Sequence, residues 1–132
     1  MPKRTKVNTG KAYRAFGPFS QAIKTDTLVF VSGQLPINPS TGDIIVANIK
    51  EETRQVLFNL KEVLTAAGSS LENVLKTTVF ITNMDDFSLV NEVYEEFFSN
   101  QAPPARSCVE VSRLAKGAHV EIEAIALVKS TR

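Results

Sequence analysis

The chain has 132 residues, a net charge of +1 and one cysteine. This size and balance are typical of one soluble globular domain, so we treat 1–132 as a single domain with a short N-terminal leader at 1–15. The near-neutral charge gives no long-range attraction for nucleic acid or anionic membrane, and no apolar run approaches the ~20 residues of a membrane span. A lone cysteine excludes an intramolecular disulfide, and a lone histidine, His119, excludes a histidine-rich metal site.

The leader is basic, and its sequence MPKRTKVNTGKAYRAF contains no acidic residue. It lacks the apolar segment of a secretion signal but is compatible with a poor mitochondrial presequence. Because a predicted strand follows almost at once, we expect a cytoplasmic protein, with the mitochondrion as the alternative.

The first predicted elements are two strands. The segment TLVFVSGQLP (27–36) is β-branched and aromatic until Gly33 and Pro36 interrupt it, which predicts a strand that ends in a loop. The preceding FGPFSQAIKT (16–25) predicts a partner strand, and INPSTGDII contains the residues of a turn.

A helix is predicted to begin after Asn48, where the apolar period changes to three and four residues. Asn48 and Glu51 form a plausible capping pair, and Gly68 suits the C-terminal stop. The predicted buried face consists of Ile49, Thr53, Val56, Leu57, Leu60, Leu64 and Ala67.

The second half of the chain predicts a central strand, NVLKTTVFIT (73–82), followed by a second helix capped by Asp85 or Asp86. Pro103 and Pro104 end this section, and two strands, RSCVEV and HVEIEAIALV, close the chain. The apolar stripe of the second helix is Phe87, Val90, Tyr94, Phe97 and Phe98.

This order of elements predicts an α/β (α+β) fold with one mixed sheet and two helices packed on one face. The two sides of the last strand both carry apolar residues: Val120, Ile122, Ala124 and Ala126 on one side, and His119, Glu121, Glu123, Ile125 and Leu127 on the other. Two helices cover only one face, so we expect the second face to be buried against another copy in a homo-oligomer.

Arg106 is the first candidate for a functional charge, because it begins a strand behind a rigid Pro-Pro pair in PPARSCVEV. A guanidinium offers a planar pair of donors that matches a carboxylate. The alternative is a structural arginine paired with a glutamate.

Glu121 is a candidate to hold or activate a water. It is equally compatible with pairing to Arg106 or Arg113 or with a solvated strand end, and Glu123 shares its side of the strand.

Cys108 is a weaker candidate, since a thiol nucleophile needs a base and nothing in the sequence places His119 beside it. We expect Cys108 to pack as a small apolar group or to offer its backbone to a ligand. Ser32 and Gly33 lie at a strand end where glycine permits close approach of a ligand, although a plain strand terminus explains them as well.

Asn91 lies on the apolar face of the second helix, where its amide either satisfies a buried polar group or faces a ligand cavity. Phe19 and Tyr94 are expected in the core or in a cavity wall. The chain has no GxGxxG or GxxxxGK[ST] motif and no basic stripe interleaved with aromatic residues. Any catalysis is therefore expected to proceed without a cofactor or a metal.

Four segments together resemble the RidA (YjgF/YER/UK) family of reactive intermediate/imine deaminases, over about Gly17 to Leu127. They are GPFSQAI, VFVSGQLPINPSTG, NLKEVLTAAGSSLENVLKTTVFITNMDDFSLVNEVYEEFF and PPARSCVEVSRLAKGAHVEIEAIAL. The resemblance implies a chorismate mutase-like fold and a homotrimer with ligand sites between subunits. It also implies hydrolysis of 2-imino acids and their enamine tautomers, such as 2-aminoacrylate and 2-iminobutanoate, to 2-keto acids and ammonia.

By the same resemblance, Arg106 grips the substrate carboxylate and Glu121 is associated with the water. Backbone groups around Cys108 and Gly33 contact the ligand. Ser32 matches the serine of the family's SGQ motif.

The family resemblance also makes Asn91 the counterpart of the asparagine in VNxxYExFF. One departure is visible, because this chain has GPF where several deaminases have GPY, so Phe19 lacks a hydroxyl.

The family also contains proteins described as translation inhibitors or ribonucleases, as chaperone-like and as mitochondrial maintenance factors. The sequence therefore predicts a 2-iminobutanoate/2-iminopropanoate deaminase that binds 2-imino and 2-keto acids, and no nucleic-acid partner is expected. The alternatives are a non-catalytic small-ligand or protein-binding module and an RNA-directed, translation-inhibiting protein.

Overall fold

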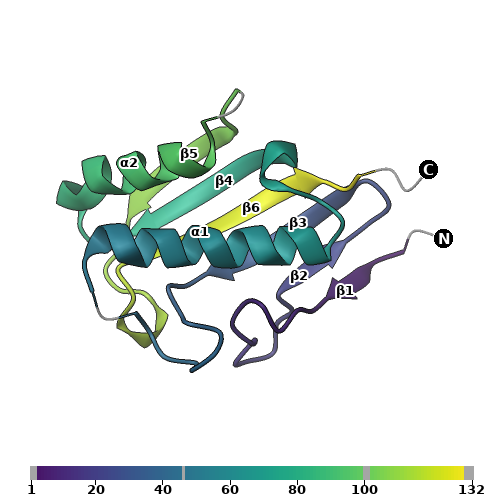
Figure 1. The fold of residues 1–132 in the computed structure, drawn as a ribbon, viewed down its shortest axis with the longest axis horizontal. Coiled ribbons are helices and arrows are strands. Elements are labelled where there is room, and N and C mark those ends of the chain that lie inside the picture. Colours follow the sequence, from purple (N-terminus) through teal and green to yellow (C-terminus); the bar gives the residue numbers. More distant parts are fainter. Residues whose placement is uncertain (1–2, 46, 100–101, 130–132) are drawn as a thin grey trace.

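The computed structural model describes residues 3–45, 47–99 and 102–129. A six-stranded sheet has the order β1-β2-β3-β6-β4-β5, and both helices lie on one face of it (Figure 1). The β4–β5 pair is parallel and the other pairs are antiparallel, which confirms the predicted mixed sheet. The strands are β1 Thr5–Val7, β2 Ala22–Lys24, β3 Leu28–Gln34, β4 Val74–Ile81, β5 Ala105–Glu110 and β6 Val120–Leu127.

Strand β1 corrects the sequence analysis, which assigned residues 1–15 to a leader. Thr5–Val7 pairs with β2, and Val7 is buried in the core. The predicted strand 16–25 shrinks to Ala22–Lys24, because Gly17 and Pro18 form a tight turn in which the Phe19 N–H donates to the Gly17 carbonyl at 2.8 Å.

Helix α1 (Ile49–Ala66) begins and ends where the sequence predicts. The Asn48 side chain accepts a hydrogen bond from the Glu51 N–H at 3.0 Å. At the other end Gly68 has a φ of +81°, a left-handed conformation that glycine adopts without steric cost. The predicted apolar face is buried against the sheet, with Val56, Leu57, Leu60 and Leu64 fully enclosed.

Helix α2 (Phe87–Phe97) starts differently from the prediction. A 3₁₀ turn, Met84–Asp86, precedes it, and the capping side chain is that of Asn83, which accepts a hydrogen bond from the Asp85 N–H at 2.9 Å. Asp86 occupies the N-cap position without a side-chain capping bond in the described structure, so the predicted cap was wrong. Asn83 has the capping role because it immediately precedes the 3₁₀ turn, which is the first helical turn of this segment.

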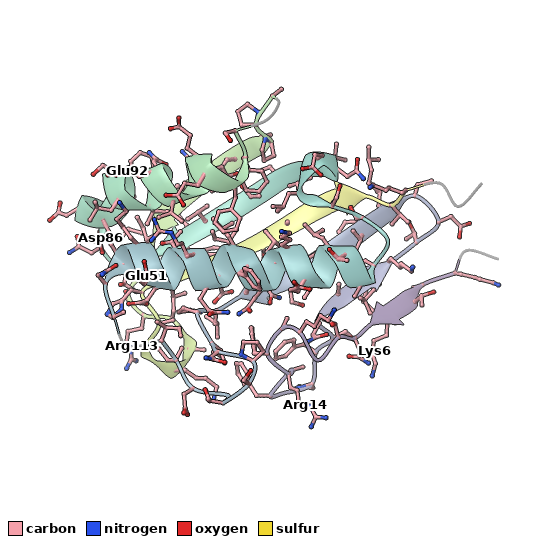
Figure 2. The ribbon with its side chains drawn as sticks, in the orientation of Figure 1. Lys6, Arg14, Glu51, Asp86, Glu92 and Arg113 are labelled. Carbon is pink, nitrogen blue, oxygen red and sulfur yellow. The ribbon has the colours of Figure 1, made fainter. Side chains whose placement is uncertain are left out.

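The two helices are joined on their solvent side by ion pairs. Lys50 contacts Glu92 at 3.3 Å and Arg54 contacts Glu96 at 3.0 Å, while Arg54 also pairs with Glu51 on its own helix. Figure 2 places Glu51 and Glu92 on the outer sides of α1 and α2. Exposed pairs of this kind contribute little stability, and the packing of the helices on the sheet holds the layers together.

The two faces of the sheet differ in cover. In β6 the side chains of Val120, Ile122, Ala124 and Ala126, which the sequence places on one side of the strand, are buried beneath the helices. On the opposite face, hereafter the open face, Phe30 pairs with Ile125 and Leu28 pairs with Leu127. Phe30 and Leu127 are each 44% exposed. A contiguous apolar surface of this kind typically marks a site of association.

Neither α1 nor α2 has the length and apolar character that crossing a bilayer requires, and these are the α-helices in the described residues.

Candidate active site

Arg106 lies on the helix-covered face of the sheet. It stands in register with Thr77 of β4, and the Thr77 hydroxyl is hydrogen-bonded at 2.8 Å to the hydroxyl of Tyr94 in α2. The Arg106 Nη1 donates to Asn91 Oδ1 at 2.7 Å. The amide on the apolar side of α2 therefore orients the guanidinium. Asn91 also lines the depression beside Arg106, so both roles considered for it remain open.

Aromatic rings also hold the guanidinium. The Arg106 Cζ lies 4.8 Å from the centre of the Tyr94 ring and 5.4 Å from that of Phe87. No carboxylate in the described ranges forms an ion pair with Arg106, so the predicted alternative of a structural Arg–Glu pair is not observed. An open depression of about 680 Å³ adjoins the side chain, between the end of α2 and Pro103–Pro104.

Glu121 lies on the open face instead. It is paired across the sheet with Phe80, and its neighbours in β6, Val120 and Ile122, point beneath the helices. Glu121 is half-buried whereas Glu123 is exposed. Both residues lie on the same side of the strand, so the alternation of side chains could not distinguish them in the sequence. Burial raises the pKa of Glu121, and the negative charge of Glu123 raises it further.

Gly33 provides the space in which the Glu121 side chain lies. The pairing of β3 with β6 shifts between Val31 and Gln34, so Gly33 sits at an irregularity of the ladder. A Cβ at position 33 would lie 1.9 Å from Glu121 Oε2. The absence of a side chain at Gly33 is therefore a condition for the observed position of the Glu121 carboxyl group.

Ser32, next to it, uses its hydroxyl within the protein by donating to the Ser20 carbonyl at 2.6 Å. Phe19 is 39% exposed and packs edge-on against Phe16 with ring centres 5.4 Å apart. It lines a depression with Lys6 and Arg14, away from the residues around Arg106.

Apart from Phe19, the predicted site residues thus form two groups on opposite faces of one sheet. The arginine half-site consists of Arg106, Asn91, Tyr94 and Cys108, and the glutamate half-site consists of Ser32, Gly33 and Glu121. Within one chain the sheet separates them. Sequence reasoning missed this separation, and it also missed Tyr13, whose hydroxyl donates to the Gly33 carbonyl at 3.0 Å. No periodic pattern or motif distinguishes Tyr13 in the leader.

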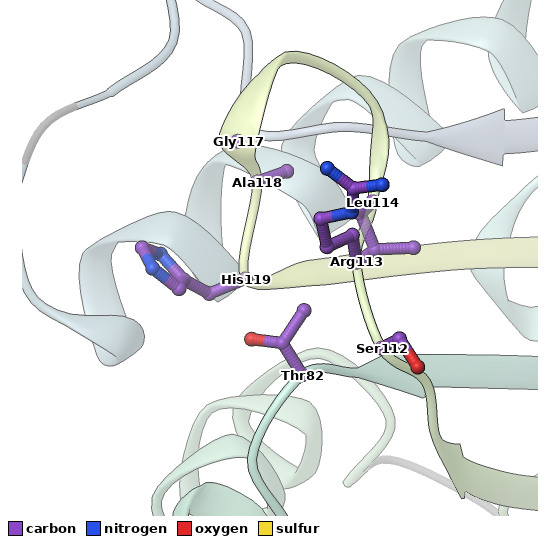
Figure 3. A pocket seen from close by; sticks show the side chains of 7 residues that line it. All are labelled: Thr82, Ser112, Arg113, Leu114, Gly117, Ala118 and His119. Carbon is purple, nitrogen blue, oxygen red and sulfur yellow. The ribbon is translucent and has the colours of Figure 1, made fainter.

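Cys108 and His119 are not partners. Cys108 packs against the core on the helix-covered face. His119 lines a different depression, of about 520 Å³, and its ring points away from Arg113 in the same lining (Figure 3). The His119 Nδ1 lies 3.0 Å from Oε2 of the buried Glu52 carboxyl group. Among the described residues, no group of three His, Cys, Asp or Glu side chains is placed to hold a metal ion.

If the protein hydrolyses 2-imino acids, as the family resemblance implies, Cys108→Ala should retain this activity within about threefold of the unmodified protein. Burial raises the pKa of the thiol, with the nearby Arg106 charge acting in the opposite direction, so the group is mainly a protonated thiol near neutral pH. The measurement is turnover of a 2-imino acid together with thermal unfolding. An inactive variant with an unchanged melting temperature would restore the nucleophile interpretation.

Known proteins resemble nearly the whole chain. The family model described as Endoribonuclease L-PSP matches residues 9–128. A RutC family protein of Pyrococcus horikoshii is 52% identical over 120 residues, 91% of this chain and 94% of the relative. The 2-iminobutanoate/2-iminopropanoate deaminase of Mus musculus is 44% identical over 124 residues, 94% of this chain and 91% of the relative.

The structural match is equally extensive. The crystal structure of E. coli TdcF with bound serine superposes with a TM-score of 0.89 at 42% identity, covering 95% of this chain and 99% of TdcF. Matches of this length and identity establish descent from a common ancestor as well as a common fold. The chain therefore belongs to the RidA (YjgF) family, whose family model carries the description Endoribonuclease L-PSP.

Proposed function

We propose that this protein hydrolyses 2-imino acids and their enamine tautomers, such as 2-iminobutanoate and 2-aminoacrylate, to 2-keto acids and ammonia, without a cofactor. The observation that carries the proposal is the arginine half-site, in which Asn91 and two aromatic rings orient Arg106 beside an open depression. Relatives named as 2-iminobutanoate/2-iminopropanoate deaminases and the serine bound to TdcF support a small carboxylate ligand.

We further propose that the site is completed by a second copy of the chain in a homotrimer. Arg106 is on β5, an edge strand, while Glu121 is on the open face with its apolar residues. If the open face packs against the next copy in a closed ring, each copy gives its arginine half-site to one neighbour and its glutamate half-site to the other. Both groups then reach one ligand, which a single chain does not permit.

The chemistry requires one anion receptor and one proton-transfer group. Arg106 binds the substrate carboxylate through parallel charge-assisted hydrogen bonds and so orients the adjacent C=N carbon. Water attacks this carbon while Glu121 relays one water proton to the imine nitrogen, which gives a carbinolamine. A second relay moves the hydroxyl proton to the amino group, the C–N bond breaks, and ammonia and the 2-keto acid leave.

Glu121→Gln should lower turnover by about 10²-fold, the usual contribution of general acid–base catalysis, while binding of a non-reactive 2-keto acid stays within about threefold. Because protonated Glu121 cannot accept a proton, kcat/KM should decline on the acid side, and the raised pKa of Glu121 places this decline at a higher pH than the ordinary pKa of glutamate would. This acid limb should be absent in the variant. Normal turnover with weakened binding would instead give Glu121 a structural role.

The direct test couples the protein to threonine dehydratase and follows 2-keto acid and ammonia release. The proposal predicts release faster than the spontaneous rate and proportional to the protein concentration. Release at the spontaneous rate, with a 2-keto acid still bound in an Arg106-dependent manner, would identify a non-catalytic binding module. RNA binding that weakens steeply with salt, in the absence of imine turnover, would favour the RNA-directed alternative.

Two further expectations depend on this assignment. The first is the homotrimer of the chorismate mutase-like fold, and the mass of the protein in solution tests whether three copies assemble. A cytoplasmic location, with the mitochondrion as the alternative, is tested by fractionating cells and following the protein.

A further inference from the structure

Tyr13 is the one buried phenol that touches the glutamate half-site in the described structure. It comes from the loop before β2, is 5% exposed, and donates its hydroxyl hydrogen to the Gly33 carbonyl at 3.0 Å. Position 33 is where the missing Cβ leaves room for the Glu121 carboxyl group. A side chain from outside the strands therefore fixes the peptide on which Glu121 rests.

The loop that carries Tyr13 is itself held by a buried amide. Gln21 is 4% exposed and its Nε2 donates to the Tyr13 carbonyl at 2.8 Å and to the Thr9 carbonyl at 3.1 Å. Its Oε1 accepts from the Thr9 N–H at 2.7 Å. One of these bonds holds the Tyr13 backbone and the other two hold Thr9 in the same loop, so the phenol reaches Gly33 from a supported loop.

The peptide before Gly33 is held as well. The Gln34 Nε2 donates to the Ser32 carbonyl at 2.9 Å. With Tyr13 on the next carbonyl, both carbonyl groups at the irregularity between Val31 and Gln34 have side-chain donors. An irregular ladder lacks some of the bonds that fix a regular strand, and these donors replace them.

We propose that Tyr13 is a positioning residue of the deaminase site: its hydroxyl fixes the Gly33 carbonyl and thereby the place of the Glu121 carboxylate. This inference rests on the proposed function. Phe19 has no hydroxyl to offer, whereas Tyr13 brings a phenol to the glutamate half-site from another point of the same loop. Burial and the charge of Glu121 raise the pKa of Tyr13 to about 12, which keeps the phenol protonated and a donor at physiological pH.

The test is a double-mutant cycle of Tyr13→Phe and Glu121→Gln in the full-length protein. Tyr13→Phe should lower kcat about tenfold with KM within twofold and the oligomer intact. In the Glu121→Gln background the same change should have no further effect on kcat, because Tyr13 acts through Glu121. The proposal would be overturned if the double variant lost kcat by the product of the two single losses, or if Tyr13→Phe had a normal kcat.

Tyr94→Phe is the matched control. It also removes a phenol hydroxyl, but from the arginine half-site, where Tyr94 bonds to Thr77. Its effect should therefore multiply with that of Glu121→Gln. A Tyr94 effect that also vanishes in the Glu121→Gln background would mean that the cycle reports general disorder of the site, which would overturn the specific role of Tyr13.

A second readout does not depend on activity. The Glu121 carboxyl ¹³C resonance, assigned by its loss in Glu121→Gln, is titrated by NMR in the unmodified protein, Tyr13→Phe and Tyr94→Phe. We expect a titration midpoint displaced by about half a pH unit or more in Tyr13→Phe and an unchanged one in Tyr94→Phe. An unchanged midpoint in Tyr13→Phe would overturn the proposal. A displaced midpoint in a protein that hydrolyses no imine would leave Tyr13 fixing Glu121 while the proposed function fails.

Discussion

Arg106→Ala should lower kcat/KM for a 2-imino acid by about 10²–10⁴-fold. The change removes two charge-assisted hydrogen bonds to the substrate carboxylate, each contributing roughly 1.5–3 kcal/mol, and about 1.4 kcal/mol corresponds to tenfold. In the structure the guanidinium is held by Asn91 and lies against Phe87 and Tyr94. It is therefore already oriented before the substrate arrives, which makes its loss costly.

The fold should tolerate this substitution. Arg106 is on an edge strand and is half-buried, and the lost contacts with the rings are worth about 1 kcal/mol, which corresponds to a few degrees in Tm. Arg106→Lys keeps the charge but lacks the planar pair of donors, so it should recover only part of the activity. The measurements are steady-state kinetics, Tm and oligomer mass.

Arg54→Ala is the matched control, because it removes another arginine from the same chain at a distance from both half-sites. Arg54 pairs with Glu51 and Glu96 on the outer side of the helices, and its activity should stay within twofold. Equal losses from Arg54→Ala and Arg106→Ala would point to a general effect of charge. Full activity in Arg106→Ala would remove the carboxylate receptor from the mechanism.

Gly33→Ala should reduce turnover by about 10²-fold, as much as removing the Glu121 carboxylate, since the same proton-transfer group is lost. The added Cβ would lie 1.9 Å from Glu121 Oε2, 2.6 Å from Cδ and 2.9 Å from Cγ. Glu121 must then leave its place. Because these atoms belong to the end of a flexible side chain, the displacement should change the catalytic group without unfolding the sheet, and Tm should fall by a few degrees at most.

Gly10→Ala provides the comparison, since a Cβ there would have nothing within 4 Å. It should leave kcat unchanged. A crystal structure of Gly33→Ala should show the Glu121 carboxyl group moved away from β3. A variant with normal turnover, or with Glu121 in its original place, would contradict the role given to this glycine.

Local features of the fold were predictable from the sequence. The α1 cap at Asn48, its end at Gly68 and the division of the β6 residues between two sides follow from neighbouring residues, and the structure confirms them. The Asp cap of α2 was wrong because an unforeseen 3₁₀ turn moved the capping role to Asn83. Strand β1 was missed because three residues give too short a pattern.

The grouping of the candidate site residues could not be predicted, because it depends on contacts between segments that are far apart in the sequence. Arg106 and Glu121 were each identified as candidates. The face of the sheet on which each side chain lies depends on how β5 and β6 pair with β4, and neighbouring residues in the sequence do not determine this pairing. Tyr13 was missed for a similar reason, because its contact with Gly33 spans twenty positions in the chain. The sequence thus indicated the candidate residues, and the pairing of the strands decided how they are grouped.

Mixing two inactive variants tests the central claim that one active site needs Arg106 from one copy and Glu121 from another. Arg106→Ala and Glu121→Gln chains are unfolded together in equal amounts and refolded into mixed oligomers. In a closed ring each cleft receives the intact arginine half-site with a probability of one half and the intact glutamate half-site with the same probability. The account predicts recovery of about one quarter of the unmodified activity. Activity no higher than that of the separate variants, in oligomers proven to be mixed, would contradict it.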